Sequence, residues 1–327
     1  MKAWQVLELG EPRDVLALRE VPDPVPGPGQ VLVRVRAAAA NFPDLLMCRG
    51  QYQVRPELPF TPGVELCGEI VAVGAGVTGF SVGDPVIGGP VQPTGGFGEL
   101  AVMRADAILP APDGLDDAEA AAFFITYQTG WFGLHRRARL AAGETLLVHA
   151  AAGGVGSGAV QLGKAAGARV IGVVGGERKA EAARVLGADV VIDRYEQDFV
   201  EVVKEVTGGR GADVVYDPVG GEAYARSTKC IAFEGRILVV GFASGQIPAV
   251  TLNHALIKNY SIVGLHWGLY ATRDPQSIKD AHVALSGLVA DGLIRPLVSE
   301  RLRLDDVPDG LARLGEGDVV GRIAFLP

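Results

Sequence analysis

Cysteine is scarce in this sequence of 327 residues. The three cysteines, Cys48, Cys67 and Cys230, are well separated, and none belongs to a Cys-x-x-Cys pair. Neither a disulfide framework nor a cluster of thiolate metal ligands is therefore indicated. The low cysteine content fits a reducing compartment, and we expect a cytoplasmic protein.

The sequence also lacks an excess of positive charge and any long hydrophobic run. Its net charge is −8, whereas proteins that bind nucleic acid usually present a basic face to the phosphates. No apolar run reaches the roughly 18 residues of a membrane helix. The first residues, MKAWQVLELGEP, lack the apolar stretch of a signal peptide. We therefore expect neither nucleic acid nor a membrane as a partner.

What the sequence does have is enough length for two domains, since a domain usually holds about 100–200 residues. From residue 145 onward, short β-branched runs alternate with alanine-rich helical stretches, a pattern typical of a parallel sheet covered by helices on both faces. The six runs are TLLVHA (145–150), ARVIGVV (168–174), ADVVI (188–192), ADVVYD (212–217), RILVVG (236–241) and YSIVG (260–264). They predict a complete doubly wound Rossmann sheet.

The two ends of the chain have a different composition. Before residue 120 the chain is rich in Pro and Gly and has short runs such as QVLVRVRA (30–37), which favours an irregular antiparallel β domain. The tail has one helical stretch (277–292) and a closing strand similar to the material of the first domain. We predict an α/β fold in which a Rossmann domain (123–271) is inserted into a β-rich catalytic domain formed by residues 1–122 and 272–327. A ligand site is expected in the cleft between them.

A glycine-rich turn follows the first predicted Rossmann strand. Residues 151–156, AAGGVG, match the pattern G-x-G-x-x-G with alanine in the first place, and they open the helical stretch SGAVQLGKAAG. Gly153 would let the backbone approach a pyrophosphate, and Gly156 would let helix and strand pack closely. The helix N-terminus, with Gly154 and Val155, then directs N–H groups at the phosphates. As an isolated motif this could be an ordinary tight turn, but six regular strands around it favour a dinucleotide site.

The end of the second strand indicates which dinucleotide binds. NAD enzymes usually carry an acid there for the ribose 2′-hydroxyl, but this chain has Gly175 at that place. Glycine leaves room for a 2′-phosphate, with which Arg178 or Lys179 can pair, so NADPH is favoured over NADH. The alternative is that Glu177 turns back to a ribose hydroxyl while the two cations lie on a solvated helix face.

Several separate motifs, in order along the chain, carry a family resemblance. They are AANFPD (39–44), PFTPGVELCGEIVAVG (59–74), VHAAAGGVGSGAVQLGKAAGARVIG (148–172) and DVVYDPVGGE (213–222). Together they resemble the zinc-independent quinone oxidoreductases of the medium-chain dehydrogenase/reductase superfamily, nearly end to end. The resemblance implies a GroES-like catalytic domain beside the Rossmann domain, and a homodimer.

The zinc alcohol dehydrogenases of this superfamily look similar but have a cysteine ligand at the place of Asn41 and a histidine ligand at the place of Val64. Neither replacement can bind zinc. Their structural zinc loop, with four closely spaced cysteines, would follow Gly83 and Asp84, where this chain has IGGPVQPTGGFGEL. We therefore expect no zinc.

The resemblance also implies residues near the nicotinamide and the substrate. Asn41 and Tyr52 match polar groups there in the family pattern. Alternatively, Asn41 caps a turn and Tyr52 is an aromatic residue at the rim of the site. Arg322 resembles a cationic position that reaches the 2′-phosphate in some relatives, and its alternative is a surface arginine.

For the cofactor, the family pattern falls at the ends of the Rossmann strands. The matching positions are Gly153, Gly154, Val155, Gly156, Gly175, Lys179, Gly241, Phe242 and His266. Relatives often have Tyr or His after the third strand, where this chain has Arg194 and then Tyr195, so the adenine contact is expected at this pair with a shift of one residue.

The function that follows is NADPH-dependent transfer of hydride to a quinone. In this mechanism Asn41 or Tyr52 donates a hydrogen bond to the oxygen that becomes negative, and tyrosine or water supplies a proton. Alcohol oxidation ranks low because it would lack a zinc Lewis acid. Two alternatives stay open, a reductase of activated alkenes and a non-catalytic NADPH-binding redox sensor.

Overall fold

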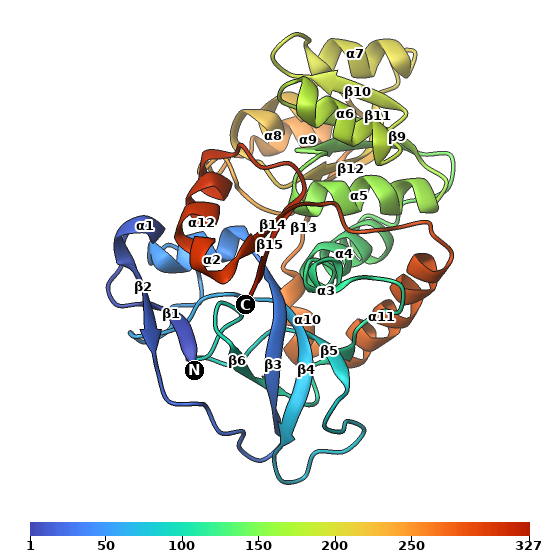
Figure 1. Ribbon diagram of the computed structural model, residues 1–327. Helices are drawn as coiled ribbons and strands as arrows, with labels where there is room; N and C mark the ends of the chain where they lie inside the picture. Colours follow the sequence, from blue (N-terminus) through green and yellow to red (C-terminus); the bar gives the residue numbers. More distant parts are fainter. The chain divides into compact units, whose positions relative to one another are not determined.

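The computed structural model describes all residues from Met1 to Pro327. The chain forms two compact units, and Figure 1 labels most of their helices and strands. Met1–Ile125 and Arg295–Pro327 make up the terminal unit, and Thr126–Ile294 make up the middle unit. Both chain ends thus belong to one unit, into which the other is inserted.

The middle unit contains a six-stranded sheet in which every neighbouring pair of strands is parallel. Across the sheet the order is β10 (Val190–Asp193), β9 (Arg169–Val174), β8 (Thr145–His149), β11 (Ala212–Asp217), β12 (Ile231–Val239) and β13 (Ser261–Gly264). In chain order this is 3-2-1-4-5-6, the doubly wound arrangement. The predicted Rossmann sheet is confirmed.

Helices alternate with these strands. They are α4 (Phe124–Trp131), the π-helix η1 (Phe132–Arg137), α5 (Gly154–Ala165), α6 (Glu177–Val185), α7 (Phe199–Val206), α8 (Gly221–Ser227), α9 (Leu252–Lys258), the 3-10 turn η2 (Trp267–Leu269), α10 (Tyr270–Arg273) and α11 (Pro275–Ala290). All five residues of β8 are buried, as expected of a central strand covered on both faces. None of the helices combines the length and apolar content needed to cross a bilayer.

One strand is longer than its sequence pattern predicted. β12 begins at Ile231 rather than at Arg236, because its first residues already pair with β11. The register then shifts, since Ala212 pairs with Ile231 and Val214 with Arg236, and Glu234 has a φ of 56°. This irregularity breaks the apolar run, so only its second half was recognisable as a strand.

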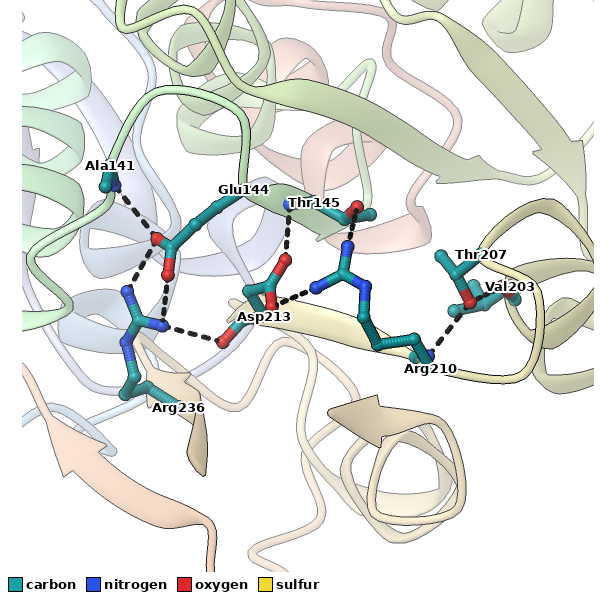
Figure 2. Close-up of polar contacts among 9 residues, drawn as sticks. Ala141, Glu144, Thr145, Val203, Thr207, Arg210, Asp213 and Arg236 are labelled. Carbon is teal, nitrogen blue, oxygen red and sulfur yellow. Dashed lines mark hydrogen bonds and ion pairs between the residues drawn. The ribbon is translucent and has the colours of Figure 1, made fainter. Parts of the chain in front are cut away.

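Ion pairs connect the central strands near their amino ends (Figure 2). Glu144, just before β8, accepts hydrogen bonds of 2.8 Å from both terminal nitrogens of Arg236, and these bonds lower the pKa of Glu144. Asp213 of β11 accepts a 2.7 Å bond from the Thr145 N–H and pairs with Arg210. The network holds β8, β11 and β12 together at the edge opposite to the one where such sheets bind ligands.

The terminal unit is built on a seven-stranded sheet and a two-stranded one. The larger sheet runs β14 (Val298–Arg303), β15 (Arg322–Leu326), β3 (Gln30–Ala39), β4 (Leu66–Val73), β5 (Pro85–Gly88) and β7 (Leu109–Pro110), with β6 (Leu100–Arg104) also paired to β3; the smaller sheet is β1 (Lys2–Val6) and β2 (Leu16–Glu20). All pairs are antiparallel except β14 with β15. β15 pairs with β3, so the closing strand joins the first domain as predicted.

Alternation of buried and exposed residues explains β3. Val31, Val33 and Val35 are buried while Arg34 and Arg36 are exposed, as in a strand with one covered face. The helical segments of this unit are short. They are α1 (Pro12–Val15), α2 (Phe42–Cys48), α3 (Asp117–Ala121), η3 (Leu304–Asp306) and α12 (Val307–Glu316).

Only the first of the two unit boundaries lies near its expected position. The first boundary, 125/126, lies close to the expected 122/123, but the second lies at 294/295 instead of 271/272. The difference is α11, which packs in the middle unit, where its Ile278 carbonyl accepts a 3.0 Å hydrogen bond from Gln128 Nε2. Its amphipathic pattern predicted the helix but not the surface that it covers.

Candidate functional site

The loop after β8 is shaped to bring the backbone close to a ligand. Ala150 has a φ of 49°, and its carbonyl accepts a 2.8 Å hydrogen bond from the Gly153 N–H. A Cβ at Gly156 would lie only 2.1 Å from the Ala150 carbonyl oxygen. Any side chain at position 156 would therefore force the strand and helix apart, as the sequence motif predicted.

Helix α5 begins immediately after this loop, with Gly153 as its N-cap. The N–H groups of Gly154, Val155 and Gly156 have no acceptor within the helix because they belong to its first turn. No acidic residue occupies that turn, so neither a carboxylate nor its charge competes with an anion. The helix is twelve residues long, and the arrangement fits a pyrophosphate.

The end of β9 meets the loop after β10. A Cβ at Gly175 would lie 3.0 Å from Arg194 Nε and 3.0 Å from the Tyr195 ring, so both side chains stand directly over the glycine. Arg194 also donates a 3.1 Å hydrogen bond to the Tyr195 hydroxyl. Asp193 holds the two loops together by accepting 3.0 Å bonds from the N–H groups of Gly176 and Tyr195. The structure thus brings Gly175, Arg194 and Tyr195 together.

The first turn of α6 carries Glu177 and Lys179, the acid and one of the two cations considered for the ribose and its 2′-phosphate. Glu177 forms a 2.7 Å ion pair with Arg184, farther along the same helix, so its carboxylate is engaged away from a ribose hydroxyl. Lys179 lies in this turn and is half-buried. This arrangement favours the phosphate interpretation of the segment over the Glu177 alternative.

The other expected cofactor residues follow β12 and β13. Gly241 and Phe242 lie just beyond β12, and a Cβ at Gly220 would be 2.7 Å from the Phe242 ring, so the loops after β11 and β12 touch. His266 follows β13 and precedes η2. These positions share the carboxyl edge of the sheet with Gly153 and Gly175, as the topology requires.

Asn41 follows β3 in the terminal unit and occupies the N-cap position of α2, with 6% of its surface exposed. Its Nδ2 donates to the Ala39 carbonyl at 3.1 Å and to Glu65 Oε1 at 2.9 Å. Because both partners can only accept, the atom facing them must be the amide nitrogen. Both amide hydrogens are thus engaged, and the expected donation from Asn41 to a substrate oxygen is wrong. The group that this amide can offer a ligand is its Oδ1 acceptor.

Glu65 and Asp44 are buried acids that the sequence analysis missed. The Asp44 carboxylate accepts hydrogen bonds of 2.8 to 3.0 Å from the N–H groups of Asn41, Gly63 and Val64. Burial raises the pKa of Asp44 to about 7, although these backbone bonds favour its charged form. The available signal was a single acid in each of two mainly apolar stretches, Asp44 in AANFPD and Glu65 in PFTPGVEL.

Arg322 is the first residue of β15, and only 4% of its surface is exposed. Its guanidinium forms a buried ion pair with Glu65, whose other oxygen accepts a 2.8 Å bond from the Ile125 N–H. The alternative of a surface arginine is therefore wrong. The expected contact with a 2′-phosphate stays a prediction, and the pairing with Glu65 speaks against it because that carboxylate already neutralises the cation.

Tyr52 lies between α2 and β4, half-buried against the core of the terminal unit. Burial raises the pKa of its hydroxyl, and the negative charge of Asp44 adds to this effect. Tyr52 is therefore protonated at neutral pH and able to donate a hydrogen bond. Its partial exposure also fits the alternative of an aromatic residue at the rim.

Metal-binding clusters are absent from the structure, in that no three His, Cys, Asp or Glu side chains are grouped to hold an ion. At the two positions where zinc relatives carry ligands, Asn41 directs an amide nitrogen at Glu65, and Val64 offers only a hydrocarbon side chain. Zinc independence remains a prediction, which chelation can test.

Two family models match the chain. The alcohol dehydrogenase GroES-like domain matches residues 27–113, within the terminal unit, and the zinc-binding dehydrogenase domain matches residues 154–283, within the middle unit. The expected combination of a GroES-like domain with a Rossmann sheet is thereby confirmed.

Known proteins resemble the chain along nearly its whole length. The quinone oxidoreductase-like protein 2 homolog of Nematostella vectensis is 40% identical over 304 residues, which cover 91% of this chain and 82% of the relative. The quinone oxidoreductase of Pseudomonas syringae pv. Tomato DC3000 has a TM-score of 0.92 at 33% identity, covering 100% of this chain and 99% of that one. The Escherichia coli quinone oxidoreductase complexed with NADPH has a TM-score of 0.92 at 31% identity, with both chains fully covered.

Proposed function

Because the chain belongs to the quinone oxidoreductase family of the medium-chain dehydrogenase/reductase superfamily, we propose that it is an NADPH-dependent reductase of small quinones. The observation that carries this proposal is the group of Gly175, Arg194 and Tyr195. A glycine replaces the usual acid, and a guanidinium and a phenol stand over it. Such a group suits a 2′-phosphate, which an acid at this place would repel.

The residues of the middle unit fit the rest of the cofactor. The first N–H groups of α5 suit the pyrophosphate, and the close contact of Gly156 with the Ala150 carbonyl fixes the start of this helix against the loop after β8. Lys179 adds a second cation for the 2′-phosphate. The solved complex of the Escherichia coli relative with NADPH supports this choice of cofactor.

Bound NADPH would supply the hydride. The protein would orient the cofactor and the acceptor, and it would stabilise the negative charge that forms on the acceptor oxygen. Tyr52 is the residue that can donate a hydrogen bond to the acceptor oxygen as that oxygen becomes negative, and it can afterwards release its proton. With a pKa above its usual value, the hydroxyl is protonated at neutral pH before the reaction. Asn41, whose Nδ2 is engaged, contributes only an acceptor.

Reduction of activated alkenes is the second candidate, because it uses the same cofactor and the same hydride step. It differs only in the acceptor that the enzyme binds. The third candidate, a non-catalytic NADPH-binding redox sensor, would need the cofactor residues but not a proton donor. The half-buried Tyr52 hydroxyl, protonated at neutral pH, is a donor of this kind and favours catalysis.

The test is NADPH oxidation with 1,4-benzoquinone, 9,10-phenanthrenequinone, acryloyl-CoA and 2-alkenals, with and without a chelator. We expect chelator-resistant turnover that is fastest with a quinone. Faster reduction of the alkenes would support the second candidate, and tight NADPH binding without turnover the sensor. Loss of activity on chelation would contradict zinc independence. Tyr52→Phe should lower kcat at least about tenfold while leaving NADPH binding unchanged.

A further inference from the structure

The Asn41 amide is held more firmly than an ordinary surface asparagine. Its two Nδ2 hydrogens are used by the Ala39 carbonyl and by Glu65 Oε1. A flip of the amide would turn Oδ1 toward two oxygens, which repel it. Oδ1 faces the Asp44 N–H in the capping box of α2, and its second lone pair is the only hydrogen-bonding capacity of this side chain that can be presented to a ligand.

Glu65 is itself fixed from two other parts of the terminal unit. Oε1, which receives the Asn41 amide, also receives the Arg322 guanidinium from β15, and Oε2 receives the Ile125 N–H at 2.8 Å. Glu65 is fully buried, and Arg322 supplies the opposite charge that such a carboxylate needs. The pair thus keeps the buried Glu65 side chain against the amide nitrogen of Asn41.

Asp44 fixes the backbone on both sides of the Asn41–Glu65 hydrogen bond. Its carboxylate binds the N–H of Asn41 and the N–H groups of Gly63 and Val64, which directly precede Glu65. Both ends of the Asn41–Glu65 hydrogen bond are thereby held in register. The amide orientation is over-determined, which is how a preorganised binding group is built.

The chemistry of the ligands decides which of them the Oδ1 atom can serve. A quinone carries carbonyl oxygens, which only accept hydrogen bonds, whereas the nicotinamide riboside half of NADPH carries hydroxyl and carboxamide donors. NADH carries the same donors, and it lacks only the 2′-phosphate. A hydrogen-bond acceptor fixed at residue 41 therefore suits the nicotinamide riboside half, which NADPH and NADH share.

We propose that Glu65 and Arg322 are positioning residues that orient the Asn41 amide so that its Oδ1 accepts a hydrogen bond from the nicotinamide riboside. The assignment rests on the proposed function, because it requires a nicotinamide cofactor. It gives Arg322 a role distinct from the 2′-phosphate contact. It also leaves Tyr52 as the group that serves the acceptor oxygen.

The first experiment removes the charge of Glu65, with the dissociation constants of NADPH and NADH and the thermal midpoint as readouts. Glu65→Gln keeps the length of the side chain, but its single amide oxygen cannot accept hydrogen bonds from Asn41, Arg322 and the Ile125 N–H together. The Asn41 amide then loses its fixed orientation, and we expect both cofactors to bind about tenfold more weakly at a near-native thermal midpoint.

The second experiment uses Arg322→Gln and Arg322→Lys, with NADPH and NADH titrated separately. A positioning role predicts that Arg322→Gln weakens both cofactors by the same factor, about tenfold, and that Arg322→Lys recovers most of the loss. A phosphate contact would instead weaken NADPH alone. Glu300→Gln is the matched control, because it removes another Glu–Arg pair of the terminal unit, with Arg313, and should leave both constants unchanged.

The outcomes separate this assignment from the proposed function. If the wild-type protein binds neither cofactor, both fail. If it binds NADPH but Glu65→Gln binds both cofactors as tightly as the wild-type protein, only the positioning role is overturned. A selective loss of NADPH in Arg322→Gln would overturn it as well, and this substitution remains informative where Glu65→Gln does not fold.

Discussion

His149, the last residue of β8, is a buried base that needs no ligand to explain it. Its Nε2 lies 2.7 Å from Ser227 Oγ, and that hydroxyl donates its single hydrogen to the Ala223 carbonyl, also at 2.7 Å. Nε2 must therefore carry the proton and donate. The ring packs edge-on against Phe199 at 4.9 Å. Burial lowers the pKa of His149 to about 4, so the folded protein keeps this ring neutral.

This pKa predicts an acid-dependent loss of stability. Between about pH 6.5 and pH 4 the unfolded chain binds a proton at residue 149 that the folded protein does not, so the free energy of unfolding falls as the pH drops. We expect a loss of roughly 2 kcal/mol from this group between about pH 7 and pH 4.5. His149→Gln keeps a donor for Ser227 Oγ but does not titrate. Urea unfolding at both pH values should show a smaller loss in the variant, and an equal loss would refute the assignment.

The sequence predicted residues whose role is set by local backbone geometry. Gly156 and Gly175 belong to strand–turn–helix units, in which the spacing alone dictates where a side chain cannot fit. The direction of the Asn41 amide was predicted wrongly because it depends on Glu65 and, through it, on Arg322, 257 residues farther along the chain. A sequence names the amide, but only the fold decides which of its atoms remains available.

Among the elements, the helices of the middle unit differ in how much room their glycines have. A Cβ at Gly163 of α5 would lie 2.5 Å from a Leu146 methyl group and 3.0 Å from a Val170 methyl group, since α5 packs closely on β8 and β9. At Gly287, in the last turns of α11, a Cβ would meet nothing within 4 Å. Glycine is thus required in one helix and merely tolerated in the other.

Two alanine substitutions test this contrast. Gly287→Ala should raise the free energy of unfolding by about 0.5–1 kcal/mol, because alanine loses less backbone freedom in a helix. Gly163→Ala gains the same propensity but must displace the buried Leu146 and Val170 side chains, and we expect a net loss of about 1–3 kcal/mol. Thermal or urea unfolding measures both. Stabilisation by Gly163→Ala would show that α5 leaves room for a methyl group beside Leu146 and Val170.

Elements differed in how well the sequence predicted them, for a physical reason. The six parallel strands are short, continuously apolar and separated by helices, so each is recognisable alone. In the terminal unit, β3 pairs with β4, β6 and β15, which lie far apart in the chain, and such nonlocal pairing leaves only a general β-rich signature. The second boundary was misplaced because the sequence of α11 does not say against which unit its apolar face packs.

At the scale of the whole molecule, one surface of the middle unit is unusually apolar. β13 is an edge strand of the six-stranded sheet, and α9 with the segment before it exposes large aliphatic side chains. The most exposed are Ile247, Leu252, Leu256 and Ile257, each more than 70% accessible. We propose that a second copy of the chain covers this surface, since an edge strand can pair with its own copy about a two-fold axis.

The dimer makes a direct prediction. Light scattering should give twice the chain mass of 34.1 kDa for the wild-type protein, and one chain mass for Leu256→Glu combined with Ile257→Glu. Val185→Glu is the matched control, because Val185 is also a 76% exposed aliphatic residue but lies on α6, away from α9 and β13. A monomeric wild-type protein, or a dimer that survives the double substitution, would contradict the proposal.

The central claim is that the chain reduces quinones with NADPH recognised over Gly175. The most direct measurement is kcat/KM for quinone reduction with NADPH and with NADH, in the wild-type protein and in Arg194→Gln. We predict a preference for NADPH in the wild-type protein. The variant should lose about tenfold or more in kcat/KM with NADPH, through a missing charged hydrogen bond to the 2′-phosphate, and change little with NADH. Absence of quinone turnover, equal use of both cofactors, or an equal loss with both in the variant would contradict the account.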